Sequence, residues 1–360
     1  MYCYICNKKI ERSHFFYKNM CETCGKINYN KRNELINLKG YVAVVTGGRV
    51  KIGYETALKL LRSKAFVIIT TRFPYQAAIK FSEEPDFNKW NKKLKIYGID
   101  FRITPYLYEF IEYLKYNFNY IDILINNAAQ TVRPSKQEYE KFVELEKDTF
   151  YKLDNNLKKL IPKKKYISNI NSIQLYKAEK NNNLIIESYT SNYYTQKSNI
   201  KNSWNSKACD VSVIELLENQ LINITAPFVL STELRSLMES SPHKLKYIIN
   251  VSAMEGKFYK KNKNCFHPHT NMCKAAINMF TRTSAQDYIK SGILMNSVDT
   301  GWITDENPSN IKSANIKKGI MPQLDEKDGA SRICDPIFSS IERNINTYGM
   351  FLKNYRCTEW

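Results

Sequence analysis

Six short apolar runs recur along the chain, and stretches with helical spacing separate several of them. The runs are rich in Val, Ile and Leu and lie at 41–48, 65–72, 94–100, 121–129, 243–253 and 292–301. Between the first two, "YETALKLLRSK" has the apolar spacing of an amphipathic helix. Continuous apolar strands that alternate with helices predict an α/β fold with a doubly wound parallel sheet, a Rossmann fold.

One long stretch interrupts this alternation. From about residue 152 to about residue 206 the chain is rich in Lys, Asn and Tyr and has little periodicity. Such a composition buries too little apolar surface to offset the entropy of ordering. We therefore expect a surface insertion, held back onto the fold by Trp204 near its end.

Length, charge and the N-terminus narrow the class of protein. The chain has 360 residues, enough for one or two domains, and a net charge of +19. The lysines are scattered, and AT-rich codons could supply much of the excess of positive charge, so nucleic acid is not a favoured partner.

No signal peptide follows Met1, and no apolar run approaches the roughly 18 residues that span a bilayer. We expect no membrane association, a cytoplasmic location and reduced cysteines.

Two cysteine pairs stand at the start of the chain, in "CYIC" and in "CETC". Paired hooks of this kind suit tetrahedral zinc, and four thiolates leave no open coordination position for catalysis. We expect a structural zinc site made by Cys3, Cys6, Cys21 and Cys24; two disulfides are the alternative. The predicted organisation is a small zinc ribbon at 1–37, followed by a larger domain at 38–360 that carries the insertion.

The stretch "VVTGGRVKIGYETA" combines a strand, a glycine-bearing turn and the start of a helix. Such a turn lets the backbone approach a pyrophosphate, which then lies at the positive end of the helix.

The order of TGG…G, NNAA, Ser, Lys and a TG turn resembles the short-chain dehydrogenase/reductase superfamily over residues 38–356, without the insertion. The resemblance implies an NADP-binding domain, because Arg72 lies after the second strand, where an arginine accommodates the 2′-phosphate of NADP and an acid would select NAD. The cofactor-binding residues that it implies are Thr46, Gly47, Arg49, Lys51, Ile52, Gly53, Arg72, Asp100, Asn127, Ala128, Lys274, Gly301 and Thr304. Three residues depart from the family motifs. Lys51 replaces a glycine in the glycine turn, Ala129 replaces a glycine in the NNAA turn, and Thr300 replaces a proline in the TG turn.

The resemblance also implies a catalytic set in which Asn223, Ser252 and Lys274 match the family, but Thr270 stands where the family has its catalytic tyrosine. In the family that tyrosine gives or takes the proton, and the lysine lowers its pKa. A threonine hydroxyl cannot be brought into that pKa range. The replacement that we favour is Tyr259, in the loop after Ser252; His269, preceded by His267, and Glu255 are alternatives.

Two functions remain open at this stage. The first is an NADP(H)-dependent oxidoreductase with an altered proton donor, acting on an unidentified carbonyl or alcohol. The second is a catalytically silent NADP(H)-binding sensor or scaffold. Within the superfamily, the chain resembles a divergent branch that has a zinc hook and lacks the usual tyrosine. The resemblance implies a small-molecule substrate and a homo-oligomer.

Overall fold

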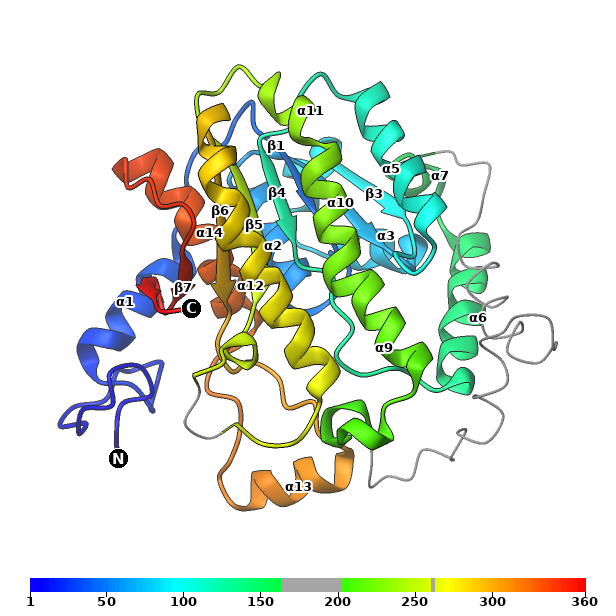
Figure 1. The fold of residues 1–360 in the computed structure, drawn as a ribbon. Coiled ribbons are helices and arrows are strands. Elements are labelled where there is room, and N and C mark those ends of the chain that lie inside the picture. The colour runs from blue at the N-terminus through cyan, green and yellow to red at the C-terminus, as the bar shows by residue number, and fades with distance from the viewer. Residues whose placement is uncertain (163–201, 260–262) are drawn as a thin grey trace.

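The apolar runs form the strands of an eight-stranded sheet in the computed structural model, which describes residues 1–162, 202–259 and 263–360 (Figure 1). The strand order is β3-β2-β1-β4-β5-β6-β7-β8, and only the β7–β8 pair is antiparallel. The chain runs outward from β1 to β3 and returns to β4 beside β1, which is the reversal of a doubly wound sheet. The predicted fold class is therefore confirmed. The strands are β1 (Val42–Val45), β2 (Phe66–Thr71), β3 (Leu94–Gly98), β4 (Ile123–Asn126), β5 (Lys246–Ser252), β6 (Ile293–Asp299), β7 (Phe351–Lys353) and β8 (Arg356–Thr358).

Helices connect these strands and cover both faces of the sheet. The α-helices are α1 (Glu22–Asn33), α2 (Lys51–Arg62), α3 (Pro74–Ser82), α4 (Phe87–Trp90), α5 (Thr104–Asn117), α6 (Lys136–Lys152), α7 (Asn155–Lys158), α9 (Val213–Gln220), α10 (Ala226–Glu233), α11 (Arg235–Glu239), α12 (Pro268–Tyr288), α13 (Ser309–Lys317) and α14 (Glu326–Arg343). Shorter helical turns are η1 (Asn91–Lys93), η3 (Ser203–Asn205), η4 (Ala208–Asp210), η6 (Met254–Gly256) and η7 (Ile289–Ser291), and a π-helical turn, η5 (Leu221–Thr225), joins α9 to α10.

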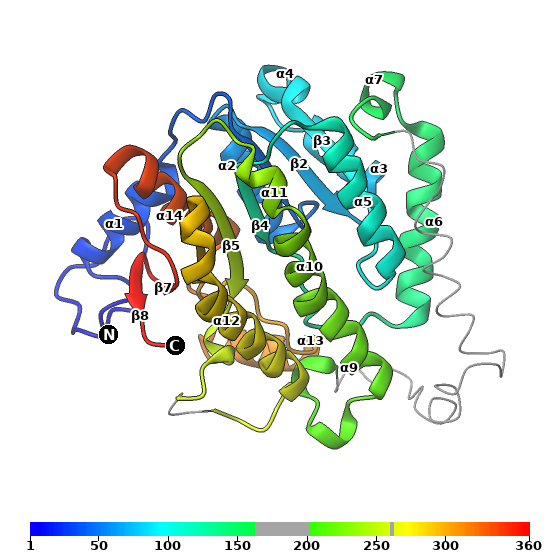
Figure 2. The ribbon, with the colours of Figure 1, turned by 45° about the horizontal axis from the view of Figure 1, so that its top comes forward.

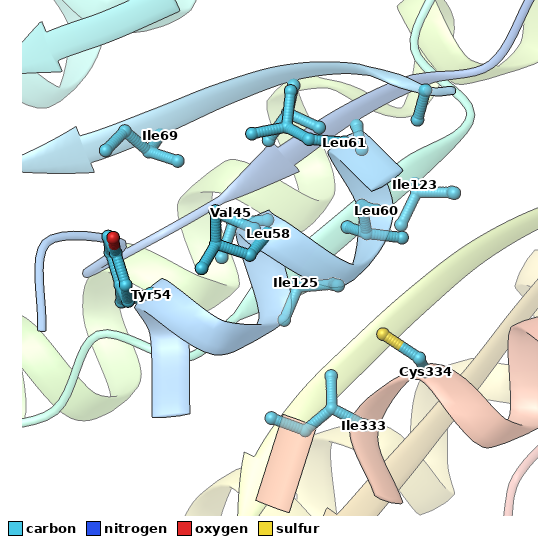
Figure 3. Close-up of a cluster of buried hydrophobic side chains, with 14 of the residues drawn as sticks. Val45, Tyr54, Leu58, Leu60, Leu61, Ile69, Ile123, Ile125, Ile333 and Cys334 are labelled. Atoms are coloured by element: carbon cyan, nitrogen blue, oxygen red, sulfur yellow. The ribbon is translucent and has the colours of Figure 1, made fainter. Parts of the chain in front are cut away.

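Alternate strand residues face opposite layers, and this divides the core in two. Val45 faces α2 and α14, where Leu58 and Ile333 belong to the same buried cluster (Figure 3). Its neighbour Val44 faces the other layer, formed by α5, α10 and α12 (Figure 2). Since both faces are buried, the strands need the continuous apolar sequences by which they were predicted.

The sequence did not predict β7 and β8, and it placed the start of the insertion too early. β7 and β8 have three residues each, and Lys353 and Arg356 interrupt their apolar character. Leu153 and Leu160 are buried in the core, and Leu160 accepts a hydrogen bond from the Ile96 N–H at 2.9 Å. Residues 163–201 of the predicted insertion lie outside the described residues. Near its end, Trp204 stacks on His267 at 3.9 Å between ring centroids, as a residue that holds the segment on the fold would do.

One apolar segment corrects the expectation that no run is long enough to span a bilayer. The continuous helix Val213–Glu233, made of α9, η5 and α10, has the length and composition for it. Its residues Ile222, Ala226 and Leu230 are buried against the sheet, so its apolar character has a structural explanation within this fold.

The N-terminal segment, residues 1–33, folds as a turn followed by a helix and not as a ribbon of strands; it is called the cysteine clip below. Its strand-like pairing is limited to isolated bridges such as Ser13–Cys21. The second cysteine hook opens α1, in which Glu22 in the first turn and Lys31 in the last complement the helix dipole. In Figure 1 the clip lies beside α14 and the C-terminal strands.

Candidate active site and metal centre

A cavity of about 780 Å³ opens at the carboxyl ends of the parallel strands. This edge, where the strand order reverses, is where open α/β sheets bind their ligands. The loops after β1, β2, β4, β5 and β6 all contribute to the lining, and so does one residue of the cysteine clip, Tyr4. Most of the residues selected from the sequence therefore meet at one place, although they are spread over some 250 residues of chain.

The glycine turn packs so closely against its neighbours that a side chain would not fit at Gly47 or Gly53. Gly47 has a φ of +69°, and a Cβ on Gly53 would lie 2.2 Å from the Gly47 carbonyl oxygen. Thr46 fixes the neighbouring turn, since its Oγ1 accepts hydrogen bonds from the backbone N–H groups of Asn127 and Ala128, each at 2.9 Å. Asn127 in turn donates from Nδ2 to the Thr46 carbonyl at 2.9 Å. The turn and the first residues of α2, Lys51 to Gly53, line the cavity, which brings the N-terminus of a helix to the place where a pyrophosphate would bind.

Lys51 and Thr304 are joined across the mouth of the cavity through Glu306. The Lys51 Nζ lies 2.7 Å from Glu306 Oε1, and the Thr304 hydroxyl donates to the same oxygen at 2.8 Å. Ile52, beside Lys51, lines the same wall. The ammonium therefore has a carboxylate partner in this conformation, and a phosphate would have to compete with Glu306 for it.

Two arginines gather at the end of β2. Arg72 Nη1 is buried and has no hydrogen-bond partner within the described part of the chain. Arg49 lies nearby, and burial together with the like charge of Arg72 lowers its pKa. Its Nη1 donates to Gln76 Oε1 at 3.2 Å. Two cations held close together, one with an orphaned donor, form a site that an anion would stabilise.

Asp100 is committed to a neighbouring arginine. Its carboxylate is fully buried and accepts from Arg102 Nη2 at 2.6 Å and from Arg102 Nε at 3.0 Å. Burial alone would raise the pKa of Asp100, but the Arg102 guanidinium outweighs it and holds the value at about 2. Asp100 lines the cavity, and both of its oxygens are engaged within the protein.

Ser252, Thr270 and Lys274 line one wall of the cavity together. Ser252 ends β5, whereas Thr270 and Lys274 are one turn apart on α12 and share a face. The Ser252 and Thr270 hydroxyls are buried and lack a hydrogen-bond partner among the residues described. The Lys274 Nζ donates to the Val251 carbonyl at 2.8 Å. Burial lowers the pKa of Lys274 to about 8. Two unpaired hydroxyls and an ammonium of depressed pKa thus surround the same space.

Asn223 lies in the π-helical turn η5, next to this wall but outside the cavity lining. Its Oδ1 accepts from the Gln130 N–H at 2.8 Å, and its Nδ2 donates to Asn219 Oδ1 at 3.1 Å. π-Helical turns are rare and occur often at functional sites. Here the turn holds the loop that follows β4 against the helix.

Of the three groups considered as replacements for the tyrosine, Tyr259 and His269 lie outside the cavity lining and Glu255 lies within it. The Tyr259 side chain is 77% exposed and is not part of the cavity lining. His269 is buried, with its Nε2 3.6 Å from Glu215 Oε1, and also lies outside the lining. His267 is hydrogen bonded through Nδ1 to the Trp204 carbonyl at 2.7 Å. Glu255 does line the cavity.

Several lining residues were not selected from the sequence, and two of them connect distant parts of the chain. Asp299 accepts hydrogen bonds from the backbone N–H groups of Met254 and Gly301 at 2.8 and 2.9 Å, and burial raises its pKa. It ties the loop after β5 to the turn after β6. The other residue is Tyr4, which is almost 300 residues from that turn in sequence. A local motif can indicate neither contact, since both arise from tertiary packing.

The four N-terminal cysteines form one cluster. Their sulfur atoms all lie within 4.8 Å of one another, and Cys6 Sγ is 3.9 Å from Cys21 Sγ. Zinc–sulfur bonds of about 2.3 Å in a tetrahedron separate the sulfurs by about 3.8 Å. The cluster of Cys3, Cys6, Cys21 and Cys24 therefore fits a four-thiolate metal site.

Comparison with known families identifies the class of protein that this fold and cavity define. The family model described as short chain dehydrogenase matches residues 41–158, and the one described as Enoyl-(Acyl carrier protein) reductase matches residues 198–328. The chain belongs to the short-chain dehydrogenase/reductase superfamily.

Individual relatives have low sequence identity to this chain or match only part of it. An uncharacterised protein of Acanthamoeba polyphaga mimivirus is 29% identical over 99% of this chain and 73% of its own length. A 2-dehydro-3-deoxy-D-gluconate 5-dehydrogenase of Pseudoalteromonas atlantica is 35% identical, over 29% of this chain and 41% of that protein. Among solved structures, a short chain dehydrogenase from Burkholderia cenocepacia in complex with NADP has a TM-score of 0.58 and 16% identity, covering 88% of this chain and 97% of that one.

Proposed function

We propose that this protein is an NADP(H)-dependent oxidoreductase that interconverts a carbonyl compound and an alcohol, with a proton donor other than the family's tyrosine. The observation that carries the proposal is the wall formed by Ser252, Thr270 and Lys274, which faces the same cavity as the glycine turn. A bound NADPH would supply a hydride to the carbonyl carbon. The protein has to hold the carbonyl oxygen and give it a proton.

The arginine pair supports NADP(H) over NAD(H). A 2′-phosphate at the end of β2 would give the orphaned Arg72 Nη1 a partner and relieve the repulsion between Arg72 and Arg49. The NADP that is bound in the Burkholderia cenocepacia relative agrees with this choice. The glycine turn, free of side chains at Gly47 and Gly53, would receive the pyrophosphate.

Lys274 is the proton donor that the geometry favours. Tyr259 points to solvent, whereas Lys274 lines the cavity and has a pKa of about 8, close to working pH. In reduction, the carbonyl oxygen takes a proton from the Lys274 ammonium, directly or through the Thr270 hydroxyl or a water, as the carbon takes the hydride. The products are the alcohol and a neutral lysine, which regains its proton from solvent. Ser252 would hydrogen bond to the same oxygen and orient it.

A catalytically silent sensor or scaffold is the second candidate. The threonine at position 270 and the exposed position of Tyr259 favour it. The two candidates share the cofactor and differ in turnover, so a carbonyl screen with NADPH separates them: the oxidoreductase consumes NADPH with at least one substrate.

Arg72→Ala tests the cofactor. We expect weaker NADPH binding by about 1 to 3 kcal/mol, because a charge-assisted contact to the 2′-phosphate is lost. NADH binding should hardly change. The measurement is a fluorescence or calorimetric titration with each dinucleotide, and Arg282→Ala, at an exposed position of α12, is the matched control. Equal losses for both dinucleotides would mean that Arg72 serves the fold instead.

We also propose that the cysteine cluster holds one structural zinc ion. Four thiolates within 4.8 Å of one another can occupy all four positions of a tetrahedral ion, which supports a closed site. Zinc thiolates and free cysteines suit a reducing compartment, so a cytoplasmic location is part of the proposal. So is a homo-oligomer, which rests on the family alone.

A further inference from the structure

Tyr4 connects the cysteine clip to the cavity. It lies between the hook residues Cys3 and Cys6, and its hydroxyl accepts a hydrogen bond from the Trp302 backbone N–H at 3.1 Å. It is also part of the cavity lining. The turn that it contacts includes Gly301, whose φ is +85°. A residue between two cysteines of the cluster thus contacts a turn that lines the cavity.

An apolar cluster joins the same two parts of the molecule. Cys3 and Met20 of the clip are fully buried in it together with Ile303, which follows the Gly301–Trp302 turn. Ile52 of the glycine turn packs against this cluster. The clip therefore shares its core with two of the turns that line the cavity, the glycine turn and the turn after β6, and a shift of the clip would also shift those turns.

Polar contacts fasten the clip from its other side. The Tyr17 hydroxyl donates to Asp328 Oδ1 at 2.5 Å, in the first turn of α14. Arg32 forms an ion pair with the same carboxylate at 3.2 Å. The Lys59 ammonium, on α2, donates to the carbonyls of Lys31 and Arg32 at the end of α1, each at 3.0 Å. These contacts hold α1 and the turn before it. The loop of Tyr4 is held by backbone hydrogen bonds, from the Tyr4 N–H to the Asn19 carbonyl at 2.9 Å and from the Cys3 N–H to the Lys8 carbonyl at 2.8 Å, and a bound ion would add a cross-link through its cysteines.

We propose that metal binding at the cysteine cluster positions Tyr4 against the Gly301–Trp302 turn, and so controls affinity for the nicotinamide half of the dinucleotide. The proposed function puts the reacting nicotinamide beside Ser252 and Lys274, and Asp299 accepts hydrogen bonds both from the loop after Ser252, at Met254, and from this turn, at Gly301. This inference rests on the proposed function. A tetrahedral ion cross-links the first hook, at Cys3 and Cys6, to the second hook at the start of α1. Without the ion, the loop of residues 3–6 loses this cross-link, and the Trp302 N–H loses its fixed acceptor. Tyr4 is a positioning residue in this scheme, since it acts through the turn.

Tyr4→Phe tests the inference in the full-length, metal-loaded protein. Two ligands are titrated by calorimetry: NADPH, and 2′-phospho-ADP-ribose, which lacks the nicotinamide. We expect the dissociation constant of NADPH to rise about three- to tenfold, as loss of one hydrogen-bond acceptor implies, while that of 2′-phospho-ADP-ribose stays unchanged. Tyr2→Phe is the matched control, because Tyr2 is 71% exposed on the same segment and should change neither constant.

A metal arm completes the test. Zinc is removed from wild type with a chelator, circular dichroism checks that the fold persists, and the titrations are repeated before and after zinc is restored. The same selective loss for NADPH, reversed by zinc, is expected. Unchanged binding of both ligands in Tyr4→Phe, or equal losses for both, overturns the inference, as does unchanged NADPH affinity in the zinc-free protein. If wild type binds neither ligand, the proposed function fails first.

Discussion

Burial of the Lys274 side chain changes its acid–base chemistry. Desolvation favours its neutral form and lowers its pKa to about 8, although the charges of Cys273, Glu255 and Asp299 act in the opposite direction. In the family a lysine at this place assists a tyrosine. With Thr270 one turn away, the ammonium lines the same cavity as the unpaired hydroxyls of Ser252 and Thr270.

This assignment predicts a pH dependence with a definite sign. Reduction needs the protonated lysine, so kcat/KM for carbonyl reduction should fall as pH rises through about 8, and oxidation of the alcohol should rise over the same range. Lys274→Met should lower kcat by a factor on the order of 10² or more and remove the pH step. Lys290→Met, at a lysine whose side chain is 74% exposed and that is not part of the lining, is the control. A reduction rate that is flat between about pH 7 and 9 would contradict the role given to Lys274.

At the scale of elements, the second cysteine hook and α1 depend on each other. Cys21 is the N-cap of α1 and makes no side-chain capping hydrogen bond. Serine is among the best N-cap residues, so Cys21→Ser should by itself favour the helix. A loss of stability in this variant can therefore be assigned to the metal.

Accordingly, wild type should contain one zinc ion per chain by elemental analysis, and Cys21→Ser should contain none. We expect faster proteolysis within residues 1–33 of the variant, because a structural zinc site contributes folding free energy. Cys209→Ser, at an exposed cysteine outside the cluster, should keep the metal. A metal-free wild-type protein whose clip still resists proteolysis would refute the zinc site.

The elements differ in how far the sequence predicts them. The six long strands were predictable because burial on both faces demands continuous Val, Ile and Leu. β7 and β8 were not, since three-residue strands with charged ends carry no period. The glycine turn and Lys274 could be located by motif, whereas Tyr4 and Asp299 enter the cavity through packing that no local pattern records. The role proposed for Lys274 could not be predicted from the sequence, because it depends on the burial of the side chain, which is seen only in the structure.

At the scale of the whole molecule, the layer formed by α2 and α14 carries much of the stability. Leu58, on α2, is buried between the two helices and β1 (Figure 3). Leu58→Ala should lower the free energy of unfolding by about 2 to 5 kcal/mol, because it removes buried methyl groups and leaves a cavity. Denaturant titration measures this. Tyr116→Ala, at a side chain that is 90% exposed, should stay within about 0.5 kcal/mol of wild type. Comparable losses in both variants would mean that this layer is not the stabilising core.

The docking of the clip on α14 also has a consequence for the order of synthesis. Tyr17 and its partner Asp328 are 311 residues apart, so the clip leaves the ribosome long before the surface that it covers exists. At about 5 to 20 residues per second, that interval is roughly 15 to 60 s. During this time the first 33 residues have no α14 to pack against, and the proposed zinc ion would keep them folded and their thiols unreactive. Zinc supply should therefore matter more while the chain is being made than after it is complete.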